Sequence, residues 1–260
     1  MNRFFIIISL FLVAIQLSAP LQAAAPKPVE ADIKWQTWVD SIRFYKDHYG
    51  LSDVYTKKVT NTGDGYAPLD GVRNFRVVLH GVYYRGGANN AYNKKQVRPN
   101  QNPLPSDGLR ELCSENFGTA IYLYANNFNT ASPLTTCQNI NRQSNQLQYL
   151  QLTAMDEPKQ NQILKIIFDH IQNLETKPIY GHCWNGWHAS GLISALTLMQ
   201  FCGWNNADAL AYWRKNTDGN DQGYDVIVNR IKTFKPSNAY KISDRARQEI
   251  CPSQVQLMTE

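Results

Sequence analysis

The sequence predicts an α/β fold with a central, mostly parallel sheet flanked by helices. Its 260 residues are 43% hydrophobic and 18% charged, which is enough apolar material for one globular domain. Short apolar segments of strand character alternate along the chain with longer segments whose apolar residues recur at helical spacing. A compact loop that contains a cysteine joins a buried strand to a helix. Alternation of this kind is typical of α/β proteins.

The first 25 residues are predicted to be a secretory signal peptide. Arg3 precedes an apolar run, and the run ends in the small-residue stretch Leu21–Ala25, with cleavage expected after Ala23 or Ala25. The alternative is an uncleaved membrane anchor, but the apolar core is short for a span and no cysteine near the junction offers a lipid attachment site. We therefore expect an exported protein, periplasmic or secreted, with no stable membrane span after cleavage.

Residues 26–69 are expected to form an N-terminal linker and a helix that precede the main domain. The linker covers residues 26–32, and residues 33–49 carry apolar residues at helical spacing, as in an amphipathic helix. Residues 52–74 are rich in Thr, Asn, Gly and Asp and are predicted to be mostly loop. The main domain covers residues 70–251, and residues 252–260 form a tail.

Within the main domain, strand and helix signals follow one another. Residues 75–87 indicate strand, turn and strand, broken at Gly81. Residues 88–107 show no periodicity and are predicted to be a surface insertion, and the polar residues 126–146 a loop held by a disulfide at Cys137. Further strands are expected at 119–125, 147–152 and 177–180, and further helices at 106–116, 159–174, from 190 onward, at 205–216, at 224–234 and shortly before Cys251.

The five cysteines suit an oxidising compartment, where thiols pair. The simplest pairing joins Cys113 to Cys137 and Cys202 to Cys251, although four cysteines allow three pairings. An odd number leaves one thiol free. The position of Cys183, between a buried strand and a helix N-terminus, marks it as that free thiol, because backbone N–H groups and the helix dipole there favour an anion or a thiolate.

The segment from His182 to Gly191 resembles the phosphate loop of the cysteine-dependent protein tyrosine and dual-specificity phosphatases. That signature is His-Cys, five residues, Arg, and then Ser or Thr; His182, Cys183 and Ser190 match it, and Gly186 stands at the tight mid-loop turn. Ala189 occupies the place of the arginine. The resemblance covers about residues 70–235 and includes the weaker Tyr-Arg-Gly-Gly motif around Arg85. It implies a protein tyrosine phosphatase-like fold, with residues 70–251 as a phosphatase-like domain of an exported bacterial type.

The resemblance also implies roles for individual residues. Cys183 would be the nucleophile, His182 would support the loop, Ser190 would assist the leaving thiolate, and Asp156 would be the general acid, with Glu157 as its competitor. A helix-capping role for Asp156 or Glu157 is the equal alternative. The ligand would be bound by the remaining residues of the loop, namely Trp184, Asn185, Gly186, Trp187, His188, Ala189 and Gly191.

The replacement of the loop arginine by Ala189 leaves three functions open. The first function is a phosphatase of weak or altered activity, in which Arg85 or His188 partly supplies the missing charge. Its activity would be weak because loss of one preorganised charge-stabilising donor costs on the order of a hundred- to a thousandfold in rate. The second is a pseudophosphatase that binds a phosphorylated or sulfated ligand. The third is a pocket for a neutral ligand such as a sugar, lined by Trp184 and Trp187, whose more ordinary role is packing.

The remaining sequence features argue against a metal, a cofactor and a nucleic-acid partner. His48, His80 and His170 lack metal-ligand spacing, so we expect no metal and no cofactor. The formal net charge of +5 comes without Lys or Arg runs, which argues against a nucleic-acid partner. The expected partner is a phosphorylated protein or a small phosphorylated ligand, and the sequence leaves open whether the site is catalytically active.

Overall fold

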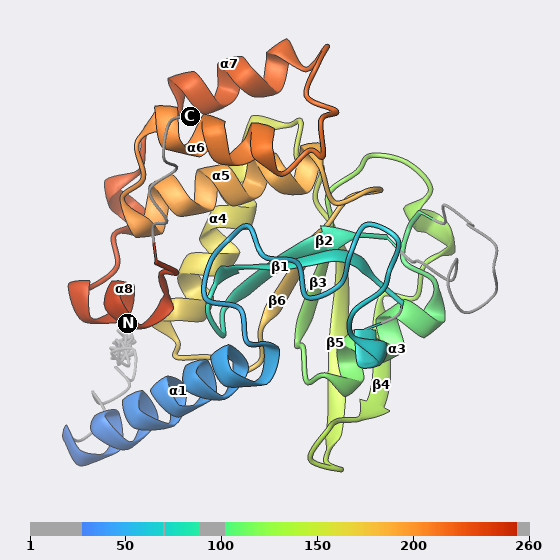
Figure 1. Ribbon diagram of the computed structural model, residues 1–260. Coiled ribbons are helices and arrows are strands. Elements are labelled where there is room, and N and C mark those ends of the chain that lie inside the picture. Colours follow the sequence, from blue (N-terminus) through green and yellow to red (C-terminus); the bar gives the residue numbers. More distant parts are fainter. Residues whose placement is uncertain (1–27, 70, 89–101, 254–260) are drawn as a thin grey trace, which may run out of the picture.

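The computed structural model describes residues 28–69, 71–88 and 102–253, and its centre is a six-stranded sheet (Figure 1). The strand order is β1-β2-β6-β3-β5-β4. Three neighbouring pairs are parallel, β2 with β6, β6 with β3 and β3 with β5, whereas the two outer pairs are antiparallel. The strands are β1 (Arg73–Leu79), β2 (Tyr83–Gly87), β3 (Thr119–Tyr122), β4 (Leu134–Gln138), β5 (Ser144–Gln151) and β6 (Ile179–His182).

Helices cover both faces of the sheet, which confirms the predicted α/β fold with a mostly parallel sheet. Figure 1 shows α4, α5, α6 and α7 on one side and α3 on the other. Helix α5 packs on β1, β2 and β6, and every residue from Ala189 to Phe201 is buried, as expected for a helix that is apolar on all sides. The helices are α1 (Pro28–Tyr49), α3 (Ser106–Ser114), α4 (Glu157–Gln172), α5 (His188–Cys202), α6 (Asn206–Lys215), α7 (Asp225–Thr233) and α8 (Asp244–Ile250).

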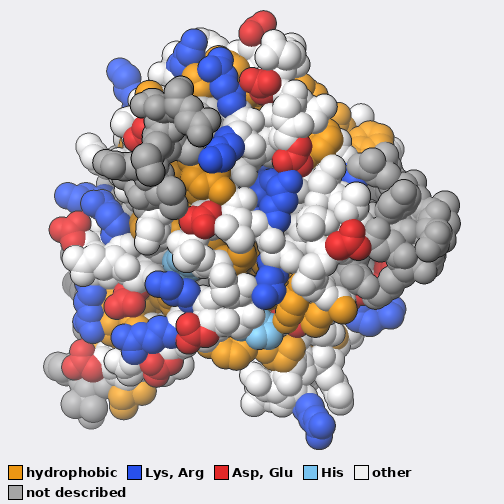
Figure 2. All heavy atoms as spheres, viewed as in Figure 1, with side chains coloured by type: hydrophobic (Ala, Val, Ile, Leu, Met, Phe, Trp, Pro, Cys, Tyr) orange, Lys and Arg blue, Asp and Glu red, His pale blue; other side chains and the backbone are white. Residues whose placement is uncertain are grey.

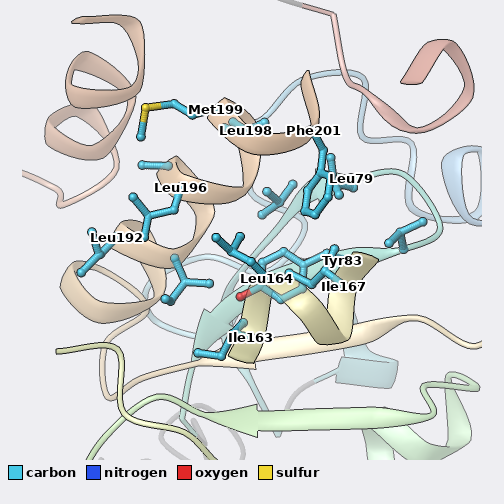
Figure 3. Close-up of a cluster of buried hydrophobic side chains, with 14 of the residues drawn as sticks. Leu79, Tyr83, Ile163, Leu164, Ile167, Leu192, Leu196, Leu198, Met199 and Phe201 are labelled. Atoms are coloured by element: carbon cyan, nitrogen blue, oxygen red, sulfur yellow. The ribbon is translucent and has the colours of Figure 1, made fainter. Parts of the chain in front are cut away.

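The sheet separates two apolar cores. Alternate side chains of β1 illustrate this, because Phe75 and Val77 pack in one core whereas Val78 packs in the other. The core under α4 and α5 is richer in Leu, Ile and Val (Figure 3). The opposite core is rich in Tyr and Phe and receives Tyr45 and Tyr49 from α1. Both layers hold the strands rigidly, so the loops at the strand ends are well supported.

Two sequence predictions about the elements were wrong. Helix α1 begins at Pro28, inside the segment 26–32 that was expected to be linker, since proline suits a first helical turn and Glu30 complements the helix dipole. The predicted loop 126–146 contains β4 and the start of β5. Strand β4 is a sheet edge whose side chains are only exposed or half-buried, so its sequence lacks the apolar alternation of a typical strand.

The cysteines pair in the simplest predicted way. Disulfides join Cys113 to Cys137 and Cys202 to Cys251, and Cys183 is free and buried. The first disulfide fastens the edge strand β4 to α3, and the second fastens the end of α8 to α5. Two disulfides indicate an oxidising environment.

Other predictions fall partly outside the described residues. The predicted signal peptide, residues 1–25, and most of the predicted insertion 88–107 lie outside the described residues. None of the helices in the described ranges is both long and apolar enough to cross a membrane. On the face shown in Figure 2, Lys and Arg side chains lie among acidic and uncharged ones.

Candidate functional site

The site lies at the edge of the sheet where the parallel strands end. The carboxyl ends of β2, β6, β3 and β5 meet there, which is the usual position of ligand sites in α/β sheets. Strand β6 ends at His182 and α5 begins at His188, so the segment between them must turn sharply. Gly186 makes this turn with a left-handed φ of 75°, and a Cβ atom there would lie 2.6 Å from the backbone of Gly86. We call residues 183–190 the cysteine loop.

The thiol of Cys183 lies at the base of this loop. Its side chain is 5% exposed, and Sγ lies 3.5 Å from the hydroxyl oxygen of Ser190. The same hydroxyl accepts a hydrogen bond of 3.3 Å from Nη2 of Arg85. The predicted nucleophile and the predicted assisting serine therefore lie side by side.

The carbonyl groups in the middle of the cysteine loop point toward β1 and β2. Four consecutive carbonyls, from Trp184 to Trp187, accept hydrogen bonds from groups on or next to these strands. The Trp184 carbonyl accepts from the Ala88 N–H (2.8 Å) and from Arg73 Nη2 (3.4 Å), and the Asn185 carbonyl accepts from Asn74 Nδ2 (2.7 Å). The carbonyls of Gly186 and Trp187 both accept from Arg85 Nη2, the Trp187 carbonyl at 3.1 Å.

This arrangement turns the N–H groups of the loop the other way, because the C=O and N–H of one trans peptide unit point in opposite directions. Within the described part of the chain, no backbone N–H of residues 184–190 donates to a protein acceptor. The N–H of Gly191 is the first that does, to the carbonyl of Trp187 at 3.1 Å. Free N–H groups together with the N-terminus of α5 make a cradle for an anion.

A pocket of about 290 Å³ opens above Cys183. Its rim is apolar and aromatic, and Trp184 is 41% exposed there. No Lys or Arg stands among the described residues that line the pocket. They are Tyr124, Met155, Cys183, Trp184, Asn185, His188, Ala189, Tyr224 and Ile227.

His182 supports the start of the loop. Its Nδ1 lies 3.1 Å from the carbonyl oxygen of Cys183 and its Nε2 lies 2.8 Å from the hydroxyl of Tyr149. The N–H of Leu104 donates to the same hydroxyl, so the tyrosine proton is free to point at Nε2 while Nδ1–H donates to the carbonyl. Burial lowers the pKa of His182 to about 4, and the ring is neutral at physiological pH.

His188 and Arg85, the two predicted sources of compensating charge, do not bring a cation into the pocket. His188 lies in the pocket wall, stacked on Tyr224 at 3.7 Å between ring centroids, and its Nε2 lies 2.5 Å from the carbonyl of Asn220. Burial is the main cause that lowers its pKa, so the ring is neutral at pH 7. Arg85 is fully buried under the loop, where it contacts carbonyls, Ser190 and Tyr212.

The predicted general acid stands beside the pocket. Asp156 is half-buried at the N-terminal cap of α4, but its side chain makes no capping hydrogen bond. Its neighbour Met155 lines the pocket and Asp156 does not. Glu157 forms an ion pair with Arg230 at 3.1 Å. Asp156 therefore does not cap α4 through a side-chain hydrogen bond, and its catalytic role stays a prediction.

The other predicted loop residues divide between the two sides of the loop. Ala189 and Asn185 line the pocket together with Trp184. The indole N–H of Trp187 donates to Asp218 at 3.0 Å, and Trp187 does not line the pocket. Gly191 faces inward, where a Cβ atom would lie 2.9 Å from the indole of Trp213.

Sequence reasoning missed four residues of the pocket: Tyr124, Met155, Tyr224 and Ile227. Tyr124 lies near the end of the predicted strand 119–125 and Met155 shortly after the predicted strand 147–152, and large apolar side chains at strand ends were a usable signal. Tyr224 and Ile227 come from the start of α7, which no local pattern connects with the cysteine loop.

Fold and site together define an α/β protein with a free cysteine at the base of an anion cradle. No family model matches the chain, and no curated protein matches it in sequence. The crystal structure of P. aeruginosa TpbA is similar with a TM-score of 0.40 and 15% identity, over 66% of this chain and 89% of TpbA. The crystal structure of a cysteine-to-serine variant of TpbA in complex with pTyr is similar with a TM-score of 0.35 and 14% identity, over 66% of this chain and 96% of the variant. Structural similarity at these TM-scores and identities does not assign an activity to this chain.

Proposed function

We propose that this exported protein binds a phosphate monoester in the cysteine loop and hydrolyses it slowly. The observation that carries the proposal is the row of backbone N–H groups from 184 to 190 without a protein acceptor, arranged around the thiol of Cys183. An oxyanion with three terminal oxygens satisfies several such groups at once. The two disulfides support the exported location.

In the reaction, the sulfur of Cys183 attacks phosphorus and the ester oxygen departs with a proton from Asp156. The product is a phosphocysteine, which water then hydrolyses to inorganic phosphate. The hydroxyl of Ser190, 3.5 Å from Sγ, donates to the sulfur as it leaves in that second step. Within the loop, transition-state charge falls on the backbone N–H groups, because Ala189 supplies no guanidinium. Turnover is therefore slow.

The rim of the pocket suits an ester whose alcohol is aromatic or apolar. Tyr124, Met155, Trp184 and Tyr224 surround the mouth and are all exposed. Exposed apolar side chains gathered around one opening favour a partner that covers them. A phosphorylated protein side chain or a small aryl phosphate meets both requirements.

Hydrolysis of p-nitrophenyl phosphate by the wild type and by Cys183→Ser tests the catalytic part. We expect slow turnover by the wild type at mildly acidic to neutral pH and none by the variant. Equal rates in the two proteins would refute catalysis at Cys183. Ser190→Ala serves as a matched variant, since it should slow phosphocysteine breakdown and leave the first release of p-nitrophenol as a burst.

A second candidate is a binding module without turnover. It is favoured by the lack of Lys and Arg among the described lining residues and by the neutral state of His188. Calorimetry with inorganic phosphate, sulfate and phenyl phosphate tests it, and binding without hydrolysis is the expected signature. A pocket that binds phenol or a sugar but none of these anions would instead be a site for a neutral ligand.

A further inference from the structure

Two arginines lie side by side beneath the cysteine loop. Arg76 on β1 and Arg85 on β2 are direct partners in the antiparallel register and are 1% and 0% exposed. Like charges directly opposite each other in a sheet are destabilising, and burial increases the cost. Such a pair persists only where the surroundings or the function of the protein compensate for it.

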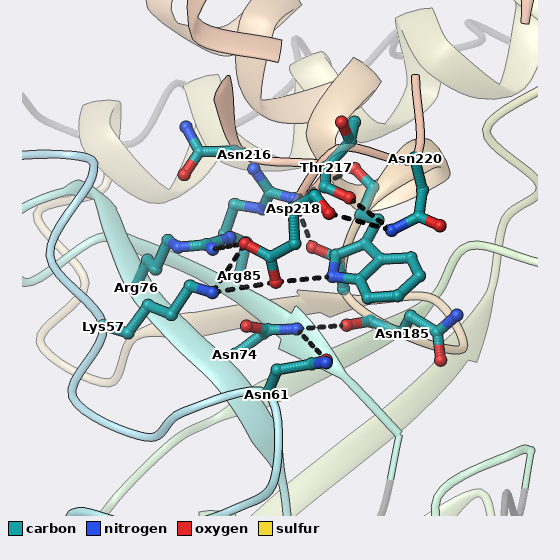
Figure 4. A network of polar contacts seen from close by, with 12 residues as sticks. Lys57, Asn61, Asn74, Arg76, Arg85, Asn185, Asn216, Thr217, Asp218 and Asn220 are labelled. Atoms are coloured by element: carbon teal, nitrogen blue, oxygen red, sulfur yellow. Dashed lines mark hydrogen bonds and ion pairs between the residues drawn. The ribbon is translucent and has the colours of Figure 1, made fainter. Parts of the chain in front are cut away.

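Among the described residues, one carboxylate forms ion pairs that partly compensate this charge (Figure 4). Asp218, from the connection between α6 and α7, lies 2.7 Å from Nζ of Lys57 and 3.8 Å from Nη2 of Arg76. Its other oxygen accepts the indole N–H of Trp187. We call Lys57, Arg76 and Arg85 the cation cluster; it places three positive charges against one carboxylate.

The compensation is incomplete. Nε and Nη1 of Arg76 and Nε of Arg85 are buried without a hydrogen-bond partner in the described part of the chain. Burial, with the charge of Arg85 as the second cause, lowers the pKa of Arg76 to about 9, so the side chain is still a cation at pH 7. The cluster therefore keeps a net positive charge on the outer side of the cysteine loop.

That charge acts on the cradle through the loop itself. Arg85 donates to the carbonyls of Gly186 and Trp187, whose peptide units present their N–H groups to the opposite side. A cation on the carbonyl of a peptide polarises it and makes the N–H a stronger donor. The positive potential of the cluster also reaches an anion in the cradle directly, and that of Arg76 and Arg85 is screened least because these two side chains are buried.

We propose that the cation cluster supplies, from behind the cysteine loop, positive charge that Ala189 does not supply from within it, and that Asp218 limits this charge. The inference rests on the proposed function, because it concerns the same anion site. Asp218 is then a residue that sets the strength of oxyanion binding without touching the ligand. Lys57, which pairs with Asp218, has the opposite effect.

Opposite signs separate this proposal from a purely structural role. If charge is what matters, Asp218→Asn strengthens phosphate binding and Lys57→Met weakens it, each by about three- to tenfold at low salt. The double variant returns close to the wild type, and high salt reduces all three differences. If the Asp218–Lys57 pair only holds the loop in place, both single variants weaken binding.

The experiment is calorimetric titration of the full chain with inorganic phosphate at pH 7, at low and high salt, with phenol as a neutral probe of the same pocket. We expect phenol binding to be equal in all variants. Weakening by both substitutions, or no change in either, would overturn the inference while leaving the proposed function intact. Lack of phosphate binding by the wild type and Asp218→Asn alike would overturn both. If Asp218→Asn does not fold, Lys57→Met alone decides, and unchanged phosphate affinity overturns the inference.

Discussion

The two sides of the cysteine loop are built in opposite ways. On the outer side, four consecutive carbonyls are hydrogen-bonded to buried groups, among them Arg85 and Asn74, and charge is concentrated. On the inner side, the N–H groups of residues 184–190 have no acceptor in the described chain, and the rim is aromatic. The difference shows how a binding loop is held open: donors on one side fix four consecutive peptide units, so that the N–H groups on the other side are free for a ligand.

Removal of Arg85 should have the largest effect on this comparison. Arg85→Met leaves the Gly186 carbonyl and the Tyr212 hydroxyl without a donor and takes one donor from the Trp187 carbonyl and from Ser190. Relief of the repulsion between Arg85 and Arg76 offsets only part of this loss, so we expect the free energy of unfolding to fall by about 3–5 kcal/mol. Denaturant titration measures this. Arg85→Lys keeps the positive charge but loses the forked guanidinium, so its free energy of unfolding should lie between those of the wild type and Arg85→Met. A change of less than about 1 kcal/mol for Arg85→Met would show that the outer contacts do not hold the loop.

Placing a guanidinium on the inner side should have the next largest effect. Ala189 lines the pocket, so Ala189→Arg directs a cation at the bound phosphate, and we expect the hydrolysis rate of p-nitrophenyl phosphate to rise about a hundred- to a thousandfold. Ala189→Met is the control for size without charge and should give no gain. Adding Cys183→Ser to the arginine variant should abolish the activity; persistence of the rate would place the reaction elsewhere.

Acid should weaken the support that His182 gives to the loop. Its pKa is about 4 in the folded protein and about 6.5 in an unfolded chain, so the unfolded state binds more protons between these values. The free energy of unfolding should therefore fall by about 3 kcal/mol as the pH drops from about 6.5 to 4.

His80 has a similarly lowered pKa of about 4 and contributes in the same pH range. The share of His182 is therefore the difference between the wild type and His182→Gln, measured by denaturant titration at several pH values. Parallel pH curves for the two proteins would contradict a neutral, buried His182.

Shortening the aromatic rim should have the smallest effect. Trp184→Ala should weaken phenyl phosphate binding by about three- to tenfold, because one aromatic contact contributes about 1 kcal/mol, and should leave inorganic phosphate binding about the same. Phe44→Ala is the matched control, since this side chain is similarly exposed, at 43%, but lies on α1 outside the pocket. Equal weakening for both ligands would mean that Trp184 shapes the cradle rather than the rim.

Much of the fold was predictable because its signals are local. Apolar periodicity located β1, β2, β3, β6 and most of the helices, although the true ends differ by a few residues. The cysteine count, with the loop position of Cys183, identified the free thiol. Strand β4 escaped prediction, because an edge strand pairs through its backbone and its side chains need not be apolar.

Only part of the site was predictable, because sequence signals are local. The residues of the cysteine loop are contiguous, so a local sequence pattern finds them all. The motif does not tell which side of the loop each side chain takes. Trp184 lines the pocket, whereas Trp187 turns outward to Asp218. That choice depends on partners more than thirty residues away in sequence.

By itself, the sequence determined a strand, a cysteine loop and a helix in succession, because hydrophobic periodicity and glycine conformation act over a few residues. Only the tertiary structure decided what surrounds that loop. The parallel sheet brings Tyr124 and Met155 to one mouth, and Tyr224 joins them from the start of α7. The β1–β2 register places Arg76 and Arg85 side by side beneath the loop. Register is fixed by the packing of the whole chain.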